Sequence, residues 1–168
     1  VSSLTRNIHH NYIVGFNNGA TSTGGVTGMN VGNTYNVNIY ANTIKNLINQ
    51  GGASGLNVAL FCNAATQYTI YDNTIDSILS NAGSTWGINI VNSTGISTFV
   101  YRNTISNLSA GSASLYVAGL FVQSGGRNFN FYNNKIYNLN NTTTGTGYTV
   151  GAYYNNAGLT AINFTPAR

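Results

Sequence analysis

Apolar and polar residues alternate along the chain in short segments that return at a regular interval. The alternation is clearest at 35–40, 68–71, 98–101 and 129–132, and a second segment follows each of these, as at 42–47 and 103–108. A period of two residues is typical of β-strands with one buried face. It places these side chains together on the face that we expect to be inside: Ile39, Ile44, Ile70, Ile75, Val100, Ile105, Phe131 and Ile136.

The tripeptide Asn-x-Ile recurs along the whole chain. Its copies begin at Asn11, Asn42, Asn73, Asn103 and Asn134, at intervals of 31, 31, 30 and 31 residues. A third strand opens at a glycine in each repeat, namely Gly28, Gly55, Gly87, Gly119 and Gly151. A fixed period with strand-like content predicts stacked coils around a continuous core. We expect residues 1–168 to form a single domain that is a fragment of a longer repeat protein.

The segment 39–47 reads Ile-Tyr-Ala-Asn-Thr-Ile-Lys-Asn-Leu, and the glycine strand follows it with a Gly-apolar-x-apolar pattern. This combination resembles the right-handed parallel β-helix of the pectate-lyase-like superfamily, and the Asn/Thr/Gly-rich coils resemble repeat regions of secreted Bacteroidota surface proteins. The resemblance implies an all-β solenoid of about five coils of roughly 31 residues with three short strands each, and no caps. It leaves the function open, because that fold carries lyases, hydrolases, adhesins and fibre shafts alike.

Equivalent residues of stacked coils lie about 4.8 Å apart, so each repeated position should form a column. The five asparagines of the tripeptides should form a ladder of carboxamides that satisfies the backbone at one corner. We therefore interpret them as structural residues.

A second column faces outward and consists of Tyr40, Tyr71, Tyr101 and Tyr132, with His9 completing it in the first coil. These rings are either a binding face for glycans or a packed shield for the corner. A shorter column of Thr43, Thr74 and Thr104 gives a faint likeness to ice-binding solenoids.

The carboxylates argue against catalysis. The chain has no Glu and only Asp72 and Asp76. Asp76 lies one period after Lys45, and Asp72 lies one period before Arg102, so we expect two cross-coil ion pairs. Calcium-dependent lyases and glycosidases need more free carboxylates than this. We predict no enzyme activity, no catalytic residue and no cofactor.

Other reactive residues suggest no site. His9 and His10 are adjacent, so strand geometry should direct them to opposite faces, which predicts no metal site. Cys62 continues an alternating apolar run and should be buried. Trp86 precedes Gly87 and should anchor a loop to the body.

The charge distribution narrows the possible partners and the location. Only 5% of residues are charged, against about a quarter in an average soluble protein, which favours an extracellular surface. The net charge of +4 is scattered along the chain, so no nucleic-acid footprint follows, and no run is long enough to span a bilayer.

The hypothesis that fits these observations best is a non-enzymatic structural or adhesive shaft of a secreted, cell-surface or filamentous protein. Its partners would be the remainder of a longer β-helix protein or stacked copies of itself, with glycans as a further candidate partner. The alternative is a carbohydrate-binding β-helix that uses the Tyr column. A polysaccharide lyase or hydrolase fragment and an ice-binding solenoid are the less favoured possibilities.

Overall fold

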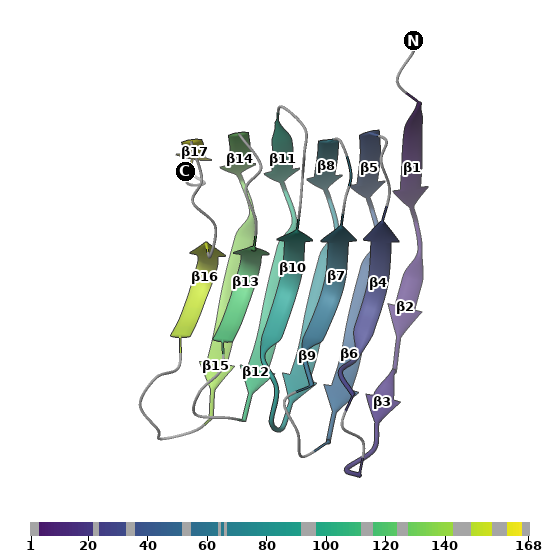
Figure 1. The fold of residues 1–168 in the computed structure, drawn as a ribbon, viewed down its shortest axis with the longest axis vertical. Coiled ribbons are helices and arrows are strands. Elements are labelled where there is room, and N and C mark those ends of the chain that lie inside the picture. The colour runs from purple at the N-terminus through teal and green to yellow at the C-terminus, as the bar shows by residue number, and fades with distance from the viewer. Residues whose placement is uncertain are drawn as a thin grey trace.

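The computed structural model of the chain describes residues 4–21, 24–32, 36–51, 55–63, 65, 67–91, 97–111, 116–123, 128–142, 149–155 and 161–165. Within these ranges the regular structure is entirely β-strand. The strands lie side by side in an ordered progression from the N-terminal to the C-terminal end of the stack (Figure 1). They form three sheets, which we name A, B and C.

Sheet A contains the strand that opens each repeat, and in the first five members this strand ends two residues before the corner asparagine. Its members, in spatial order, are β1 (Thr5–His9), β5 (Asn36–Tyr40), β8 (Gln67–Tyr71), β11 (Thr98–Tyr101), β14 (Asn128–Tyr132) and β17 (Ala161–Thr165).

Sheet B begins one residue after that asparagine. Its members are β15 (Lys135–Asn141), β12 (Thr104–Ala110), β9 (Thr74–Ser80), β6 (Thr43–Asn49) and β2 (Tyr12–Val14), and β3 (Asn17–Asn18) also pairs with β6. Sheet C contains β16 (Thr149–Asn155), β13 (Tyr116–Val122), β10 (Thr85–Val91), β7 (Asn57–Asn63) and β4 (Thr27–Gly32).

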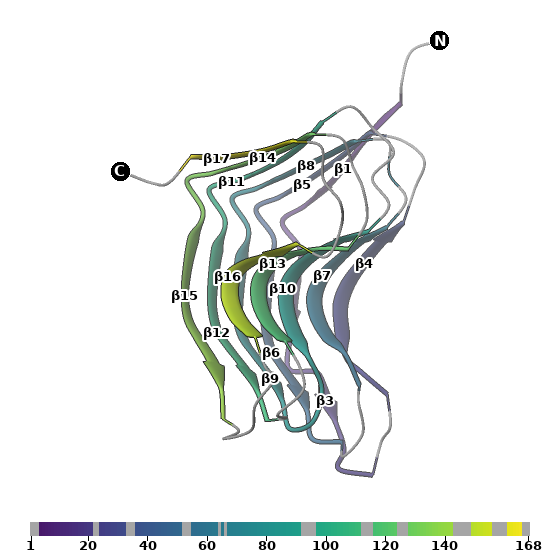
Figure 2. The same cartoon turned by 60° about the vertical axis from the view of Figure 1, so that its left-hand side comes forward.

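All of the pairings are parallel and join equivalent residues of successive repeats. In sheet A, for example, Ile39 pairs with Ile8 on one side and with Ile70 on the other. The chain visits the three sheets in turn before it returns to the first, so each repeat makes one coil of a parallel β-solenoid (Figure 2). This confirms the predicted fold class, three strands per coil and the period of about 31 residues. The handedness stays a prediction.

The core lies inside the coils and is aliphatic at its centre. Of the eight side chains predicted to face inward, all but Ile136 are at most 1% exposed, and Ile136 packs against the same cluster from the side. Isoleucine, leucine and valine predominate in the columns from β5 to β12, with Tyr68 of β8 fully buried among them, and β14 contributes Phe129 and Phe131. Burial of these columns is the main force that holds the coils together.

The glycine alignment predicted from the sequence was wrong in the second coil. Val58 pairs with Thr27, and Leu60 pairs with Met29, so Ala59 and not Gly55 is the equivalent of Gly28. Gly55 precedes β7 and belongs to a separate turn, where an added Cβ would lie 2.6 Å from the carbonyl oxygen of Gly24. The error arose because small residues occur both within the strand, as at Gly28 and Ala59, and just before it, as at Gly55. In the second coil the earlier glycine fits the Gly-apolar-x-apolar pattern.

Candidate functional site

The corner between sheets A and B carries the asparagine ladder that the sequence predicts. Asn42 donates its backbone N–H and its Nδ2–H to Oδ1 of Asn73, over 3.0 and 2.9 Å. The same two bonds join the other pairs of neighbours, Asn11 to Asn42, Asn73 to Asn103, and Asn103 to Asn134. The column is therefore directional, because every Oδ1 accepts from the coil that precedes it.

Each inner carboxamide also reaches back to the preceding coil. Nδ2 of Asn73 donates to the Ile39 carbonyl over 3.0 Å as well as to Asn103. One side chain thus ties three successive coils together. The inner members Asn42, Asn73 and Asn103 are buried with at most 2% exposure, and burial is tolerable because these polar groups are hydrogen-bonded.

The residue before each ladder asparagine adopts the left-handed conformation. The φ angles of this column are 56° at His10, 52° at Ala41, 55° at Asp72, 53° at Arg102 and 54° at Asn133. Such angles are uncommon in residues other than glycine. The carboxamide bonds fix the corner in this shape, and its side chains project beside the outward Tyr column.

The outward Tyr column is a continuous stack. Ring centroids of Tyr40 and Tyr71 lie 4.8 Å apart, those of Tyr71 and Tyr101 5.1 Å, and those of Tyr101 and Tyr132 4.8 Å, with interplanar angles of 4 to 7°. His9 extends the stack at 4.7 Å from Tyr40. Each inner ring therefore has a neighbouring ring over both of its faces, which leaves its edge and hydroxyl toward solvent.

Arg102 and Asp72 form an ion pair beside this stack. The guanidinium donates from Nε and Nη2 to the two carboxylate oxygens over 2.8 and 2.7 Å, and its carbon lies 4.8 Å from the centroid of the Tyr101 ring. Hydrogen bonding to Arg102 lowers the pKa of Asp72. Both side chains are about half exposed, so solvent screens the pair and its contribution to stability is small.

Asp76 is held differently from the prediction. It pairs in register with Lys45, but the described part of the chain shows no direct contact between the two charged groups. Instead the carboxylate accepts hydrogen bonds from Ser106 Oγ, Asn107 Nδ2 and Ser77 Oγ over 2.7, 2.6 and 3.0 Å. Burial raises the pKa of Asp76, but these bonds and the Lys45 charge outweigh it, so the pKa lies below its usual range.

The prediction that His9 and His10 face opposite sides was wrong. Strand geometry applies to His9 at the end of β1, whereas His10 lies in the left-handed turn. The turn brings the rings to the same side, with centroids 5.0 Å apart, an interplanar angle of 86° and the two Nδ1 atoms 2.7 Å apart. The signal that sequence reasoning missed is that every coil turns sharply one residue before the ladder asparagine.

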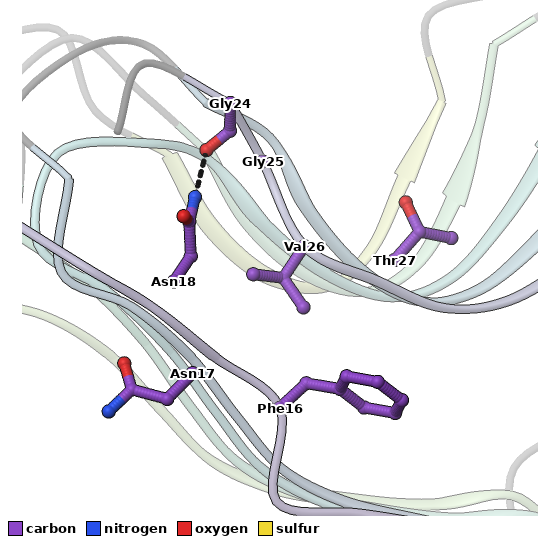
Figure 3. A pocket seen from close by; sticks show the side chains of 7 residues that line it. All are labelled: Phe16, Asn17, Asn18, Gly24, Gly25, Val26 and Thr27. Carbon is purple, nitrogen blue, oxygen red and sulfur yellow. Dashed lines mark hydrogen bonds between the residues drawn. The ribbon is translucent and has the colours of Figure 1, made fainter. Parts of the chain in front are cut away.

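Two of the hollows on the described surface lie away from the Tyr column. One, of about 360 Å³, lies between β3 and β4 in the first coil. Figure 3 shows the Val26 side chain directed toward the segment that carries Phe16, while Asn18 Nδ2 donates to the Gly24 carbonyl over 2.7 Å. The second, of about 380 Å³, is lined by Leu79, Asn107, Leu108, Ser109, Asn138, Leu139 and Asn140 on sheet B. Neither lining includes an acid, a histidine or a cysteine.

The remaining reactive side chains are buried. Cys62 is fully buried in the core as predicted, and burial raises the pKa of its thiol far above the usual range. Trp86 lies within β10 and stacks on Phe121 with ring centroids 4.0 Å apart. With Val58 and Ala118 they form a second apolar cluster, which the sequence reasoning missed. No group of three or more potential metal-ligating side chains occurs among the described residues.

The described residues include no helix with the length and hydrophobicity needed to cross a membrane. Comparisons of the chain with family models, with curated proteins and with solved structures gave no match.

Proposed function

We propose that the chain is a non-enzymatic shaft segment of a secreted, cell-surface or filamentous protein, with a structural or adhesive role. The observation that carries the proposal is the unbroken asparagine column, in which each inner carboxamide bridges three coils. Together with in-register parallel sheets, it opposes both bending and slippage between coils. A stiff rod of this kind spaces other domains or displays its loops.

The two carboxylates support the non-enzymatic part of the proposal. Asp72 is bound by Arg102 and Asp76 by two hydroxyls and an amide, so both are committed to neighbours across the coils. General acid–base chemistry on a glycosidic bond uses two carboxyl groups on either side of it. Asp72 and Asp76 do not form such a pair, because each carboxylate is hydrogen-bonded to a different set of residues.

The partner that best fits the coil edges is a further parallel coil, either from a longer β-helix protein or from another copy of the chain. Sheet edges offer unpaired backbone groups to such a coil. The ladder fixes the orientation. Each later Oδ1 of the ladder accepts from the preceding coil, so by the same pattern Oδ1 of Asn11 is left at the stack edge formed by β1, β2 and β4. It would accept hydrogen bonds only from a preceding coil of the same polarity.

The test is the mass and N-terminal sequence of the native polypeptide, with negative-stain electron microscopy of the same material. A native chain much longer than 168 residues, or rods that grow by coil stacking, supports the shaft. A compact capped monomer of this length contradicts it.

Glycan binding by the Tyr column is the alternative function, and the ring geometry does not favour it. Sugars stack on the open face of an aromatic ring, whereas the inner rings have both faces covered. Replacing Tyr71 and Tyr101 by Ala and measuring retention on a glycan array tests the alternative. If the variant loses glycan binding, the alternative function is supported, and the glycan would then contact the tyrosine hydroxyls and ring edges.

A further inference from the structure

His9 and His10 are the only histidines of the chain, and they converge at the end of the Tyr stack. Both side chains are exposed, and their Nδ1 atoms lie 2.7 Å apart. The equivalent positions of the next three coils are Tyr40-Ala41, Tyr71-Asp72 and Tyr101-Arg102. Two ring nitrogens therefore meet in the first coil alone.

Two neighbouring residues, Tyr40 and Asn11, hold the pair in place. The ring of Tyr40 stacks on His9 at 4.7 Å and 12°, and it meets His10 edge-on at 6.2 Å. Nδ2 of Asn11 donates to the His9 carbonyl over 3.2 Å, which secures the turn. The left-handed φ of His10 is part of the same corner that the ladder stabilises. The two imidazoles are thus preorganised, so little ordering is left for a ligand to impose.

In the metal-free chain one ring donates its Nδ1–H to the other Nδ1, and a metal ion that displaces this proton would be bound by both lone pairs. We propose that His9 and His10 form a Cu²⁺ site in which the two Nδ1 atoms take neighbouring positions of a square-planar ion, with water in the remaining positions. Bonds of about 2.0 Å at a right angle put two such nitrogens about 2.8 Å apart, whereas a tetrahedral ion requires about 3.3 Å. The observed 2.7 Å is a hydrogen-bond distance, and the nitrogens need to separate by only about 0.1 Å to reach the square-planar arrangement.

The geometry also sets an order among metals. Cu²⁺ and Ni²⁺ accept square-planar nitrogen ligands, and Cu²⁺ binds most tightly of the common divalent ions. Zn²⁺ requires the rings to move apart. The site is expected to prefer Cu²⁺ to Zn²⁺ by at least about tenfold.

The chain supplies its own matched variants. His10→Ala reproduces the Tyr40-Ala41 corner, where alanine already adopts the left-handed conformation with φ 52°. His9→Tyr reproduces the residue found at this place in the next four coils. Both variants should keep the far-UV circular dichroism of the parent, so a loss of metal binding cannot be ascribed to unfolding.

The experiment is calorimetric titration of the tag-free chain with a copper(II) salt, with electron paramagnetic resonance of the one-equivalent complex. We expect one Cu²⁺ per chain, nitrogen hyperfine coupling from two imidazoles, and an affinity that falls at least about tenfold in either single variant. The proposal is overturned if the parent chain takes up no Cu²⁺, if the double variant binds as tightly as the parent, or if Zn²⁺ binds as well as Cu²⁺. The outcome is independent of the shaft, which requires no metal.

Discussion

The ladder asparagines combine two functions that few residues can perform together. Each provides an acceptor for two donors of the preceding coil and donors for a carbonyl behind it and an oxygen ahead of it. Aspartate lacks the donors, and glutamine, one methylene longer, would displace both groups from the corner. The recurrence of asparagine at this place therefore follows from local bonding alone.

Replacing Asn73 by Ala should destabilise the fold strongly. The side chain is 2% exposed, and its loss removes the acceptor of the Asn42 N–H and one of the two acceptors of Asn42 Nδ2, the other being the Ile8 carbonyl. We expect the free energy of unfolding to fall by about 2 to 4 kcal/mol, measured by urea denaturation. Asn11→Ala is the matched control. Because Asn11 is exposed and no coil precedes it in the described structure, its replacement should cost less than about 1 kcal/mol. Equal losses in the two variants would contradict the ladder's role.

Acid should destabilise the chain through two side chains only. Hydrogen bonds lower the pKa of both Asp72 and Asp76, so each stabilises the fold above about pH 4, the usual pKa of an unfolded aspartate. That stability is lost as the pH falls through the lower folded-state pKa. The urea midpoint should therefore decrease between pH 5 and pH 2. The variant with both residues changed to Asn should show a much flatter profile, because the chain has no other side-chain carboxylate. An equally steep profile in that variant would refute the assignment.

At the residue scale, the sequence predicts what repeats and misses what is local to one coil. The asparagine and tyrosine columns were found because each recurs at a nearly fixed interval in at least four successive coils. The His9–His10 contact depends on one left-handed residue in the first coil. No periodicity signals it, and strand alternation gives the wrong answer there.

At the element scale, sheet B is bent in mid-strand, and the strands of sheet C are curved (Figure 2). In sheet B the bend lies at Asn46, Ser77, Asn107 and Asn138, all of which have φ between 54 and 57°. Asparagine is the residue other than glycine that tolerates this conformation best, which explains the second Asn of the repeated motif. In sheet C, Ala59 belongs to the core cluster. A Cβ added at the equivalent Gly28 or Gly87 would also meet core side chains.

Gly87→Ala tests the packing of the curved strands of sheet C. An added Cβ would lie 2.6 Å from the Gly119 carbonyl oxygen and 2.7 Å from Ile105 Cγ2. Backbone and packed core must shift to admit it, so we expect a loss of about 1 to 3 kcal/mol. Gly19→Ala is the control, since an added Cβ there meets nothing within 4 Å. Ala59 tolerates its own Cβ at the equivalent place, so a neutral result would mean that this coil can relax in the same way.

The strand order was predictable because alternation and period agree in every coil, and they identify the same inward face. The exact alignment of the third strand was not. Sheet C is apolar on both sides around Val58, Trp86 and Phe121. Apolar and polar residues therefore do not alternate clearly there, and the pattern does not identify the inward face. The sequence cannot distinguish a glycine within the curved strand from a glycine in the preceding turn, and tertiary packing decides between them.

At the scale of the whole molecule, each coil contacts mainly the coils before and after it. The stability of such a stack is approximately a sum over coils and their interfaces. A coil can then be removed without loss of the fold, provided that the cut respects the register. Deleting residues 43–73 removes one complete coil and joins Asn42 to Thr74, which already pairs with Thr43. The repeated Asn-Thr-Ile sequence is restored at the junction.

We expect this shortened chain to keep a β-type circular dichroism spectrum and to unfold cooperatively, with a urea m-value about a fifth smaller than that of the parent because less surface is exposed on unfolding. Its ladder would continue from Asn42 directly to Asn103. Deleting only residues 43–56 removes β6 and connects sheet A straight to sheet C, so the coil cannot close and that variant should aggregate or unfold. If the two deletions behave alike, the coils are not independent units, and stiffness would then have to come from contacts that span the whole stack.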